Sequence, residues 1–249
     1  MPSRTALVIP AYCEAGRVGD VVRQALQLDR ELRLGLEVVV VDDGSDDATA
    51  QEARVAGATV VSHPYNLGYG VSLHTGYCYA FRNGFDRVLQ MDADGQHEAA
   101  MLPNLIAALD DGADVVLGSR YLEGEPPAST LSRRVGTALF AWIATRFTGM
   151  RITDPTSGFQ GLSGRALGRL VSDGFPEDYP DTDVLIEHAR SGMKLVEVPV
   201  RMHSRRGGLS MHRGARIAYY GYKMLLTLLL LPVRRPSPLR QRDTVARTT

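Results

Sequence analysis

Short apolar runs alternate with helical segments along the first 100 residues of this 249-residue chain. Apolar residues with helical spacing lie at 17–34, 48–56 and 70–81. Regular alternation of strand and helix predicts an α/β fold, in which a mostly parallel central sheet is flanked by helices. Four runs have the composition of buried strands, at Ala6–Pro10, Glu37–Asp42, Ala58–Ser62 and Arg87–Met91.

A polar cluster follows each of these four predicted strands. The carboxyl ends of parallel strands share one edge of a sheet, and ligands bind there in folds of this kind. One such cluster alone would be typical of a turn or a helix cap. Four together predict a nucleotide cleft, and they lie at Pro10–Glu14, Asp42–Asp47, His63–Gly70 and Asp92–Gln96.

Two carboxylates stand close together after the fourth predicted strand. Asp92 and Asp94 are two residues apart, and Gly95, Gln96 and His97 follow them. Side chains placed in this way can face one cation, and oxygen ligands suit Mg²⁺ or Mn²⁺. Alternatively, one aspartate caps a helix that begins near residue 98 while the other faces solvent. The pair is therefore a candidate metal site, and the role of His97 stays open.

The chain is neutral overall, but its charges are unevenly distributed. Residues 1–200 hold 17 Lys and Arg against 27 Asp and Glu, whereas residues 201–249 hold 11 against the single acid Asp243. A basic tail suits an anionic lipid surface or phosphate, although a solvated tail would show the same pattern. We expect no nucleic-acid partner.

The cysteines and the N-terminus indicate a cytoplasmic protein. Cys13 and Cys78 lie 65 positions apart and form neither a zinc-binding nor a disulfide pattern. The apolar run near the N-terminus reads as a strand and is too short for a signal peptide.

The second half of the chain is less regular. A predicted strand at 114–121 is followed by a loop rich in Gly, Pro and Ser, a helix at 133–148, and a polar turn at 154–161. The apolar stripe with Phe140 and Trp142 on that helix favours a place in the core. A late strand at 194–200 contains a proline, which is typical of a sheet edge.

The segment 217–233 is largely apolar, but its uncharged part is only 10 residues long, and a spanning helix needs roughly 20. Its tyrosines and flanking basic residues are typical of a helix that lies in the membrane interface. A helix docked on the protein itself or on a second copy is the alternative. We therefore expect a catalytic domain at 1–210 and an amphipathic helical tail at 211–249.

Seven segments together resemble a known family. They are Ile9–Glu14, Val41–Thr49, Asn66–Gly70, Asp92–Gln96, Gly118–Tyr121, Asp154–Phe159 and Val196–Val200. In this order they look like the motifs of glycosyltransferase family 2, and above all those of the polyprenyl-phosphate (dolichol-phosphate) mannosyl- and glucosyltransferases. The resemblance covers roughly residues 5–210. It implies a GT-A fold, an inverting mechanism and a nucleoside-diphosphate sugar donor.

The resemblance also implies roles for single residues. Asp92, Ala93, Asp94 and Gln96 would bind the donor diphosphate and its metal, with Asp92, Asp94 and Gln96 as metal ligands. Arg205 would close on the diphosphate, and Arg120 with Arg133 or Arg134 would hold an acceptor phosphate. The remaining donor-binding residues would be Pro10, Tyr12, Glu14, Val41, Asp42, Asp43, Asn66 and Gly68.

The acceptor decides whether the reaction needs a base. A metal and Arg205 would neutralise the charge that grows on the leaving diphosphate. A phosphate acceptor is already an anion, whereas a hydroxyl acceptor needs a general base. Asp183 stands roughly where other members of the family carry that base, with a structural role as the alternative. The candidate catalytic residues are thus Asp92, Asp94, Asp183 and Arg205.

The chain departs from the family pattern in three ways. Tyr69 and Met211 stand where members often carry lysine, and no membrane-spanning helices follow the catalytic domain. Some members work as catalytic subunits recruited by a small membrane partner.

We therefore expect a metal-dependent transferase that moves a hexose from a UDP- or GDP-sugar to a polyprenyl phosphate, peripheral on the cytoplasmic membrane face. The alternatives are a family 2 enzyme that acts on a hydroxyl acceptor and a non-catalytic nucleotide-sugar binding module.

Overall fold

The computed structural model describes residues 3–122, 131–171 and 182–202. For residues 131–135 it describes the backbone but not the side chains. Arg205 and the segment 211–249, for which we predicted a role at the diphosphate and an amphipathic tail, lie outside these ranges.

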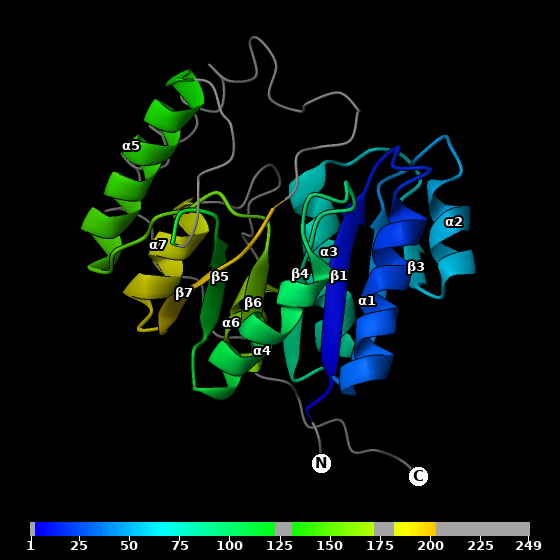
Figure 1. Ribbon diagram of the computed structural model, residues 1–249, viewed down its shortest axis with the longest axis horizontal. Helices are drawn as coiled ribbons and strands as arrows, with labels where there is room; N and C mark the ends of the chain where they lie inside the picture. The colour runs from blue at the N-terminus through cyan, green and yellow to red at the C-terminus, as the bar shows by residue number, and fades with distance from the viewer. Residues whose placement is uncertain (1–2, 123–130, 172–181, 203–249) are drawn as a thin grey trace.

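The described residues form a seven-stranded mixed sheet in the order β3-β2-β1-β4-β6-β5-β7 (Figure 1). Strand β6 runs antiparallel to both of its neighbours, and the other pairs are parallel. The strands are β1 (Thr5–Ala11), β2 (Leu36–Asp42), β3 (Thr59–Ser62), β4 (Arg87–Gln90), β5 (Val115–Ser119), β6 (Gln160–Ser163) and β7 (Leu195–Pro199).

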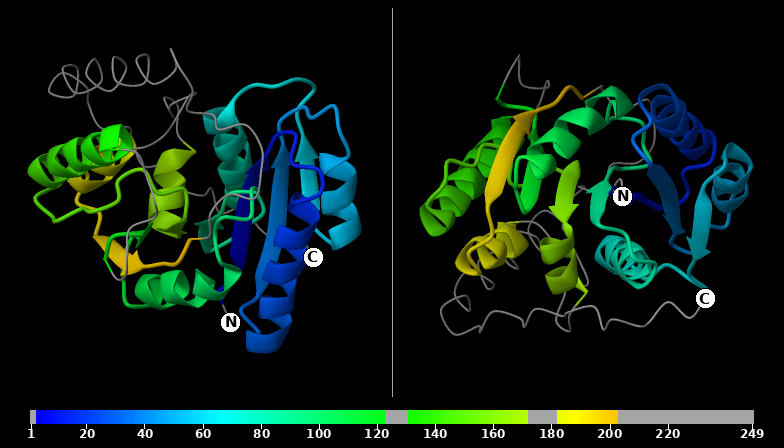
Figure 2. Two further views of the ribbon diagram at one scale, coloured as in Figure 1. Left: turned by 45° about the horizontal axis from the view of Figure 1, so that its top comes forward. Right: turned by 90° about the horizontal axis from the view of Figure 1, so that it is seen from below.

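Helices cover both faces of this sheet (Figure 2). Successive residues of β1 serve opposite faces, as strand geometry requires: Leu7 packs with helices α1 and α4, and Val8 packs with α3 and α6. The helical elements are α1 (Val18–Leu32), α2 (Thr49–Ala56), α3 (Tyr69–Arg82), the 3₁₀ turn η1 (Ala99–Met101), α4 (Leu102–Asp110), α5 (Leu131–Thr148), α6 (Gly164–Leu170) and α7 (Thr182–Arg190).

Helix α3 approaches β1 closely because position 76 is glycine. A Cβ atom there would lie 2.3 Å from Cγ1 of Val8, so a larger residue would push the helix off the sheet. This close packing matters for the site, since α3 carries Tyr69 at its first turn and Tyr77 in its buried interior.

The predicted α/β alternation is confirmed, but the polar turn predicted at 154–161 is wrong at its end. Residues from Gln160 onward form β6, which pairs with β4 and β5 in the middle of the sheet. The segment Gln-Gly-Leu-Ser has little β-prone character of its own, so tertiary pairing creates this strand. The proline-containing strand predicted at 194–200 is β7, at the sheet edge.

Helix α5 shows a second difference from the sequence prediction. Phe140 packs against Ile143 and Ile186 as expected, but Trp142 is 66 % exposed, so the prediction of a core position is wrong for Trp142. Leu139 and Phe147 on the same helix are also exposed.

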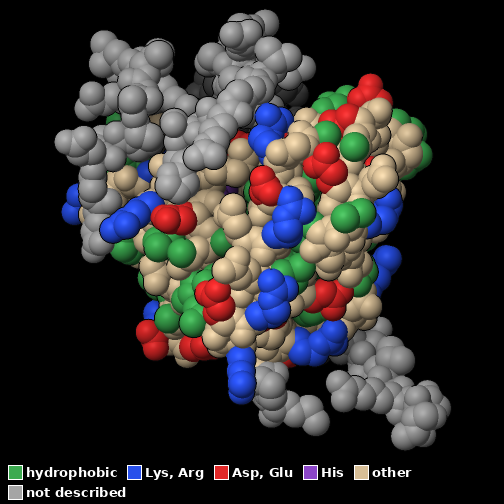
Figure 3. Space-filling model, turned by 45° about the vertical axis from the view of Figure 1, so that its right-hand side comes forward, with side chains coloured by type: hydrophobic (Ala, Val, Ile, Leu, Met, Phe, Trp, Pro, Cys, Tyr) green, Lys and Arg blue, Asp and Glu red, His purple; other side chains and the backbone are tan. Residues whose placement is uncertain are grey.

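The surface that carries α1 and α2 has a different character. Basic and acidic side chains are interspersed there with apolar ones (Figure 3). Within the described ranges, no helix is both long enough and apolar enough to cross a membrane.

Candidate active site

The predicted polar clusters meet at one edge of the sheet, as the parallel strands require. The register places Ala11 beside Asp42, and Asp42 beside Ser62. The loops that begin at residues 12, 43 and 63 therefore start side by side, and the loop after β4 lies next to them.

Asp43 anchors the loop that leads into α3. Its carboxylate accepts hydrogen bonds from the backbone N–H groups of Leu67 and Gly68, each at 2.9 Å, and contacts Nδ1 of His63 at 2.7 Å. Nε2 of His63 continues to the Thr75 hydroxyl at 2.9 Å. The carboxylate thus holds the Asn66–Gly68 segment in place. The donor contacts of Asp43, Asn66 and Gly68 stay predictions.

A glycine makes this packing possible. A Cβ atom on Gly44 would lie 2.5 Å from the carbonyl carbon of Tyr65, and the φ angle of Gly44 is +70°. Any other residue would be strained by this backbone and would collide with the neighbouring loop.

The loop after β1 offers an exposed aromatic ring. Tyr12 is 49 % exposed, whereas the carboxylate of Glu14 pairs with Nε of Arg17 at 2.5 Å. Pro10 and Val41, which were also predicted to bind the donor, lie inside β1 and β2 with buried side chains. The donor contacts of these two residues stay predictions.

Asp92 is held by residues from two distant segments. The Tyr69 hydroxyl donates to its Oδ1 at 3.0 Å, and a Cβ atom on Gly158 would lie 2.7 Å from its Oδ2. Glycine at position 158 therefore leaves room for the carboxylate. The side chain of Asp92 remains 32 % exposed.

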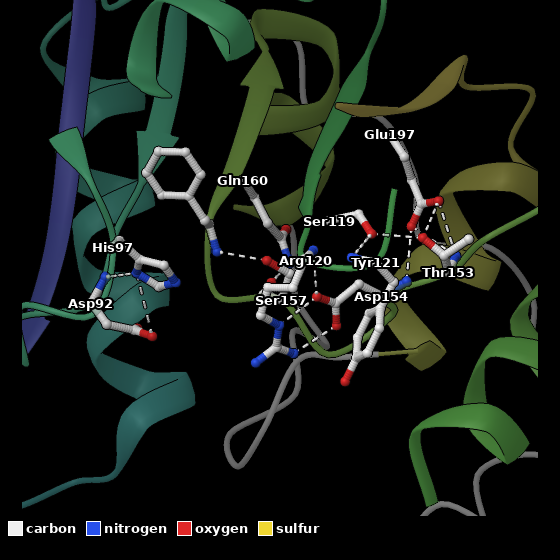
Figure 4. A network of polar contacts seen from close by, with 11 residues as sticks. Asp92, His97, Ser119, Arg120, Tyr121, Thr153, Asp154, Ser157, Gln160 and Glu197 are labelled. Atoms are coloured by element: carbon white, nitrogen blue, oxygen red, sulfur yellow. Dashed lines mark hydrogen bonds and ion pairs between the residues drawn. The ribbon is translucent and has the colours of Figure 1, made fainter. Parts of the chain in front are cut away.

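His97 supports the backbone of this carboxylate (Figure 4). Its Nδ1 accepts a hydrogen bond from the N–H of Asp92 at 3.1 Å, and its ring lies 5.1 Å from the ring of Phe159, centroid to centroid. Burial lowers the pKa of His97 to about 4, so at neutral pH the ring is uncharged and carries its proton on Nε2. This contact with the Asp92 backbone is what the structure adds to the question that the sequence left open.

The residues after β4 suit a hard divalent cation. Asp92, Asp94 and Gln96 offer oxygen atoms, all three are only half-buried, and the Gln96 N–H donates to Oδ1 of Asp94 at 3.0 Å. Within the described part of the chain, no cluster of three or more His, Cys, Asp or Glu residues forms a closed metal cage. An open site with two carboxylates is how proteins bind Mg²⁺ when substrate phosphates complete its shell.

Arg120 forms a buried ion pair (Figure 4). Its Nε and Nη2 donate to the two oxygens of Asp154 at 2.6 and 2.7 Å, and Asp154 is fully buried. Burial opposes the charge on Arg120, but Asp154 and, from farther away, Asp92 outweigh that effect and raise its pKa. The guanidinium therefore stays charged and firmly oriented.

Strand β7 in turn holds the segment that carries Asp154. The Glu197 carboxylate accepts hydrogen bonds from the N–H groups of Thr153, at 2.8 and 2.9 Å, and of Asp154, at 2.9 Å. The hydroxyls of Ser119 and Thr153 lie 2.6 Å apart. Arg120 is thus positioned by β5, by β7 and by the turn that precedes β6.

The other predicted residues are less fully placed. Asp183 lies in the first turn of α7, is 8 % exposed, and accepts a hydrogen bond from the N–H of Val184 at 3.0 Å. Arg133 and Arg134 belong to α5, but their side chains are outside the described residues. The sequence missed the roles of His63, Asp154 and Glu197, although His63 directly follows β3 and the other two lie in segments that resemble the family motifs.

The chain matches the sequence model of Glycosyl transferase family 2 over residues 6–172. It is 29 % identical to polyprenol monophosphomannose synthase of Mycolicibacterium smegmatis, across 89 % of this chain and 85 % of that protein. It is 31 % identical to dolichyl-phosphate hexose transferase of Haloferax volcanii, across 81 % and 84 %. Its fold resembles glucosyl-3-phosphoglycerate synthase of Mycobacterium tuberculosis in complex with Mn²⁺ and uridine-diphosphate-glucose, with 21 % identity, a TM-score of 0.67, and coverage of 91 % of this chain and 78 % of that one.

Proposed function

This chain belongs to glycosyl transferase family 2 and is a glycosyltransferase, and from this premise we propose that it transfers a hexose from a nucleoside-diphosphate sugar to a polyprenyl phosphate. The observation that carries the proposal is the pair Asp92 and Asp94, half-buried at the sheet edge where ligands of this fold class bind.

The donor lies across the loops after β1, β2 and β4 in this proposal. Tyr12 offers an exposed ring for the base, and Asp92, Asp94 and Gln96 hold Mg²⁺ or Mn²⁺ against the diphosphate. When bound, the cation neutralises charge on the leaving diphosphate. Named relatives and a structural neighbour support this reading, because the neighbour binds Mn²⁺ together with uridine-diphosphate-glucose.

The acceptor approaches from the side of Arg120. Asp154 occupies Nε and Nη2 of Arg120, so the remaining terminal nitrogen, Nη1, is the atom that we assign to an acceptor phosphate. The two relatives described above are named for lipid-phosphate products or substrates, which favours polyprenyl phosphate as the acceptor.

Helix α5 supports a membrane-bound acceptor. Leu139, Trp142 and Phe147 expose large apolar side chains on this helix, with Arg146 among them. Aromatic and basic residues on one helix are typical of a surface that enters the headgroup region of a bilayer. We propose that the enzyme works at the membrane surface, with α5 facing the lipid.

Turnover tests the proposal. The full chain with Mn²⁺ or Mg²⁺, a panel of UDP- and GDP-sugars and a short-chain polyprenyl phosphate should release nucleoside diphosphate. The matching polyprenol, which lacks the phosphate, is the control acceptor and should give no product. Absence of release with every donor, or full activity of Asp94→Ala, contradicts the proposal.

A hydroxyl acceptor is the second candidate, because Asp183 is a nearly buried carboxylate at a helix start. If the acceptor is a hydroxyl and Asp183 is its base, Asp183→Asn should lose most of the rate, typically about 10²- to 10⁴-fold for general-base catalysis. With a phosphate acceptor the same variant should keep most of its activity.

A further inference from the structure

Three consecutive hydrogen bonds connect the interior of α3 to the Asp92 carboxylate. The Tyr77 hydroxyl bonds to Oε1 of Gln90, Nε2 of Gln90 donates to the Tyr69 hydroxyl at 3.1 Å, and the Tyr69 hydroxyl donates to Oδ1 of Asp92 at 3.0 Å. We call Tyr77, Gln90 and Tyr69 the α3 relay.

The direction of the relay follows from the chemistry of its ends. A carboxylate can only accept, so the single hydroxyl proton of Tyr69 must point at Asp92. Tyr69 must then accept from Gln90, which can donate only through its amide nitrogen. The amide oxygen of Gln90 consequently faces Tyr77 and accepts its proton. Each member has one orientation only.

The relay begins in the buried interior of the protein. Tyr77 and Gln90 are each 3 % exposed, whereas Tyr69 is half-buried and the Asp92 side chain is 32 % exposed. Gly76 beside Tyr77 lets α3 pack directly on β1, so the buried end has little freedom to shift. A ligand in the cleft cannot reach Tyr77.

We propose that Tyr69 is a positioning residue, which fixes the Asp92 carboxylate for the divalent cation and the donor diphosphate. This rests on the proposed function, because it assumes that Asp92 binds the cation. Residues that orient metal ligands typically change metal affinity by about 10- to 100-fold when they are replaced. Tyr69→Phe removes only the hydroxyl, and we expect it to weaken Mn²⁺ binding about tenfold in the presence of nucleotide.

The same helix offers a matched control. The Tyr79 hydroxyl also donates to a carboxylate oxygen, Oε1 of Glu37, at 3.0 Å. Glu37 lies near the beginning of β2, at the opposite end of that strand from the cleft. Tyr79→Phe makes the same chemical change in the same helix, and it should leave Mn²⁺ affinity unchanged.

Tyr77→Phe distinguishes positioning from direct contact. Tyr77 is buried, so we expect a loss of Mn²⁺ affinity in this variant to reach the cation through the hydrogen bonds of Gln90 and Tyr69. We expect a loss of about threefold, smaller than that of Tyr69→Phe because Tyr69 itself remains. If Tyr69 instead acted by touching the donor, Tyr77→Phe would bind Mn²⁺ as the wild type does.

The experiment titrates MnCl₂ into each full-length variant with UDP or GDP present and follows the electron paramagnetic resonance signal of free Mn²⁺. Urea unfolding of each variant verifies that it is folded. Weaker binding in Tyr69→Phe and Tyr77→Phe but not in Tyr79→Phe supports the proposal. If all three variants bind Mn²⁺ as the wild type does, the positioning role of Tyr69 is wrong, and the proposed function is unaffected. If the wild-type protein fails to bind Mn²⁺ in the presence of UDP and also in the presence of GDP, the metal site of the proposed function is wrong as well.

Discussion

Three aspartates near the candidate site, Asp43, Asp92 and Asp154, are held in different ways in the two halves of the sheet. In the half built from β1 to β4, Asp43 accepts from backbone amides and contacts a histidine, and Asp92 accepts from the uncharged Tyr69 hydroxyl. In the half built from β5 to β7, Asp154 meets the charged side chain of Arg120.

This difference suits the partners that we propose for each half. Hydrogen bonds from uncharged groups orient Asp92 without cancelling its charge, so the carboxylate can still attract a cation. The opposite charges of Arg120 and Asp154 neutralise each other, and their two hydrogen bonds keep the guanidinium in one place. Four predictions test this contrast, and they follow from the largest expected effect to the smallest.

Asp154→Ala should destabilise the protein by about 3 to 5 kcal/mol, because it leaves Arg120 as a buried charge without its partner. Urea unfolding at pH 7 measures this. The double variant Arg120→Leu with Asp154→Ala should recover part of the loss, since no isolated charge remains.

Asp43→Ala is the control from the other half, because Asp43 is also nearly buried, at 3 % exposure. It removes hydrogen bonds to a charged group but leaves no unpaired guanidinium, so the expected cost is about 1.5 to 3 kcal/mol. The contrast between the halves is wrong if Asp43→Ala costs as much as Asp154→Ala.

The second prediction concerns His188 in α7, which is 2 % exposed. Burial is the largest influence and lowers the pKa of His188 to about 4; Arg169 acts in the same direction, and Glu187 and Asp114 oppose it. The unfolded chain, with an ordinary value near 6.5, therefore takes up the proton first as pH falls. The stability contributed by neutral His188 is present above about pH 6.5 and is lost between pH 6.5 and 4.

Between pH 7 and pH 5 this group should account for about 2 kcal/mol of lost stability. His188→Gln should remove that share, as measured by urea unfolding at both pH values. The pKa of His97 is also lowered, so His97 contributes its own loss of stability at low pH, and the His188→Gln variant keeps that loss. An identical loss in variant and wild type contradicts the prediction.

The third prediction concerns Gly158, where the second half of the sheet touches the candidate metal site. A Cβ atom at this position would lie 2.7 Å from Oδ2 of Asp92 and would displace the carboxylate. Gly158→Ala should therefore weaken Mn²⁺ binding about tenfold in the nucleotide-dependent titration. Gly136→Ala is the control, because no atom lies within 4 Å of a Cβ built there, and it should bind as the wild type does.

The last prediction compares two leucines of equal exposure. Leu139 on α5 and Leu32 on α1 are each 52 % exposed. If α5 faces lipid, Leu139→Ser should lose about 1 kcal/mol of binding to anionic vesicles, and Leu32→Ser should lose nothing. Co-sedimentation with vesicles measures both, and equal behaviour of the two variants removes α5 from the membrane surface. Both variants should keep their folding stability within about 0.5 kcal/mol.

The first half of the sheet was the easier half to predict from sequence. Its strands are β-prone, its helices have clear periodicity, and each polar cluster follows its strand directly. Parallel pairing then brings the clusters together without further information. The second half contains β6, a four-residue strand without a strong pattern, which exists because β4 and β5 lie on either side of it.

The candidate site was predictable only as a set of residue types. Asp92 and Asp94 could be recognised from their spacing, but a helix cap explained the spacing equally well. Tyr69 was visible only as a departure from the family pattern, and the sequence gives no sign that its hydroxyl reaches a carboxylate 23 positions away. Arg120 could be predicted to bind phosphate, but not to pair with Asp154, 34 positions away.

By itself the sequence determined the fold class and the edge of the sheet that carries the candidate site, because strand and helix periodicity and residues adjacent to strand ends are local properties. The resemblance of seven short segments to known motifs indicated the family. Only the tertiary structure decided that His97 supports Asp92, that Arg120 is clamped by Asp154, and that Trp142 faces outward. These outcomes depend on which distant segments meet and on how far each side chain is removed from water. Neither is encoded in any short stretch of the chain.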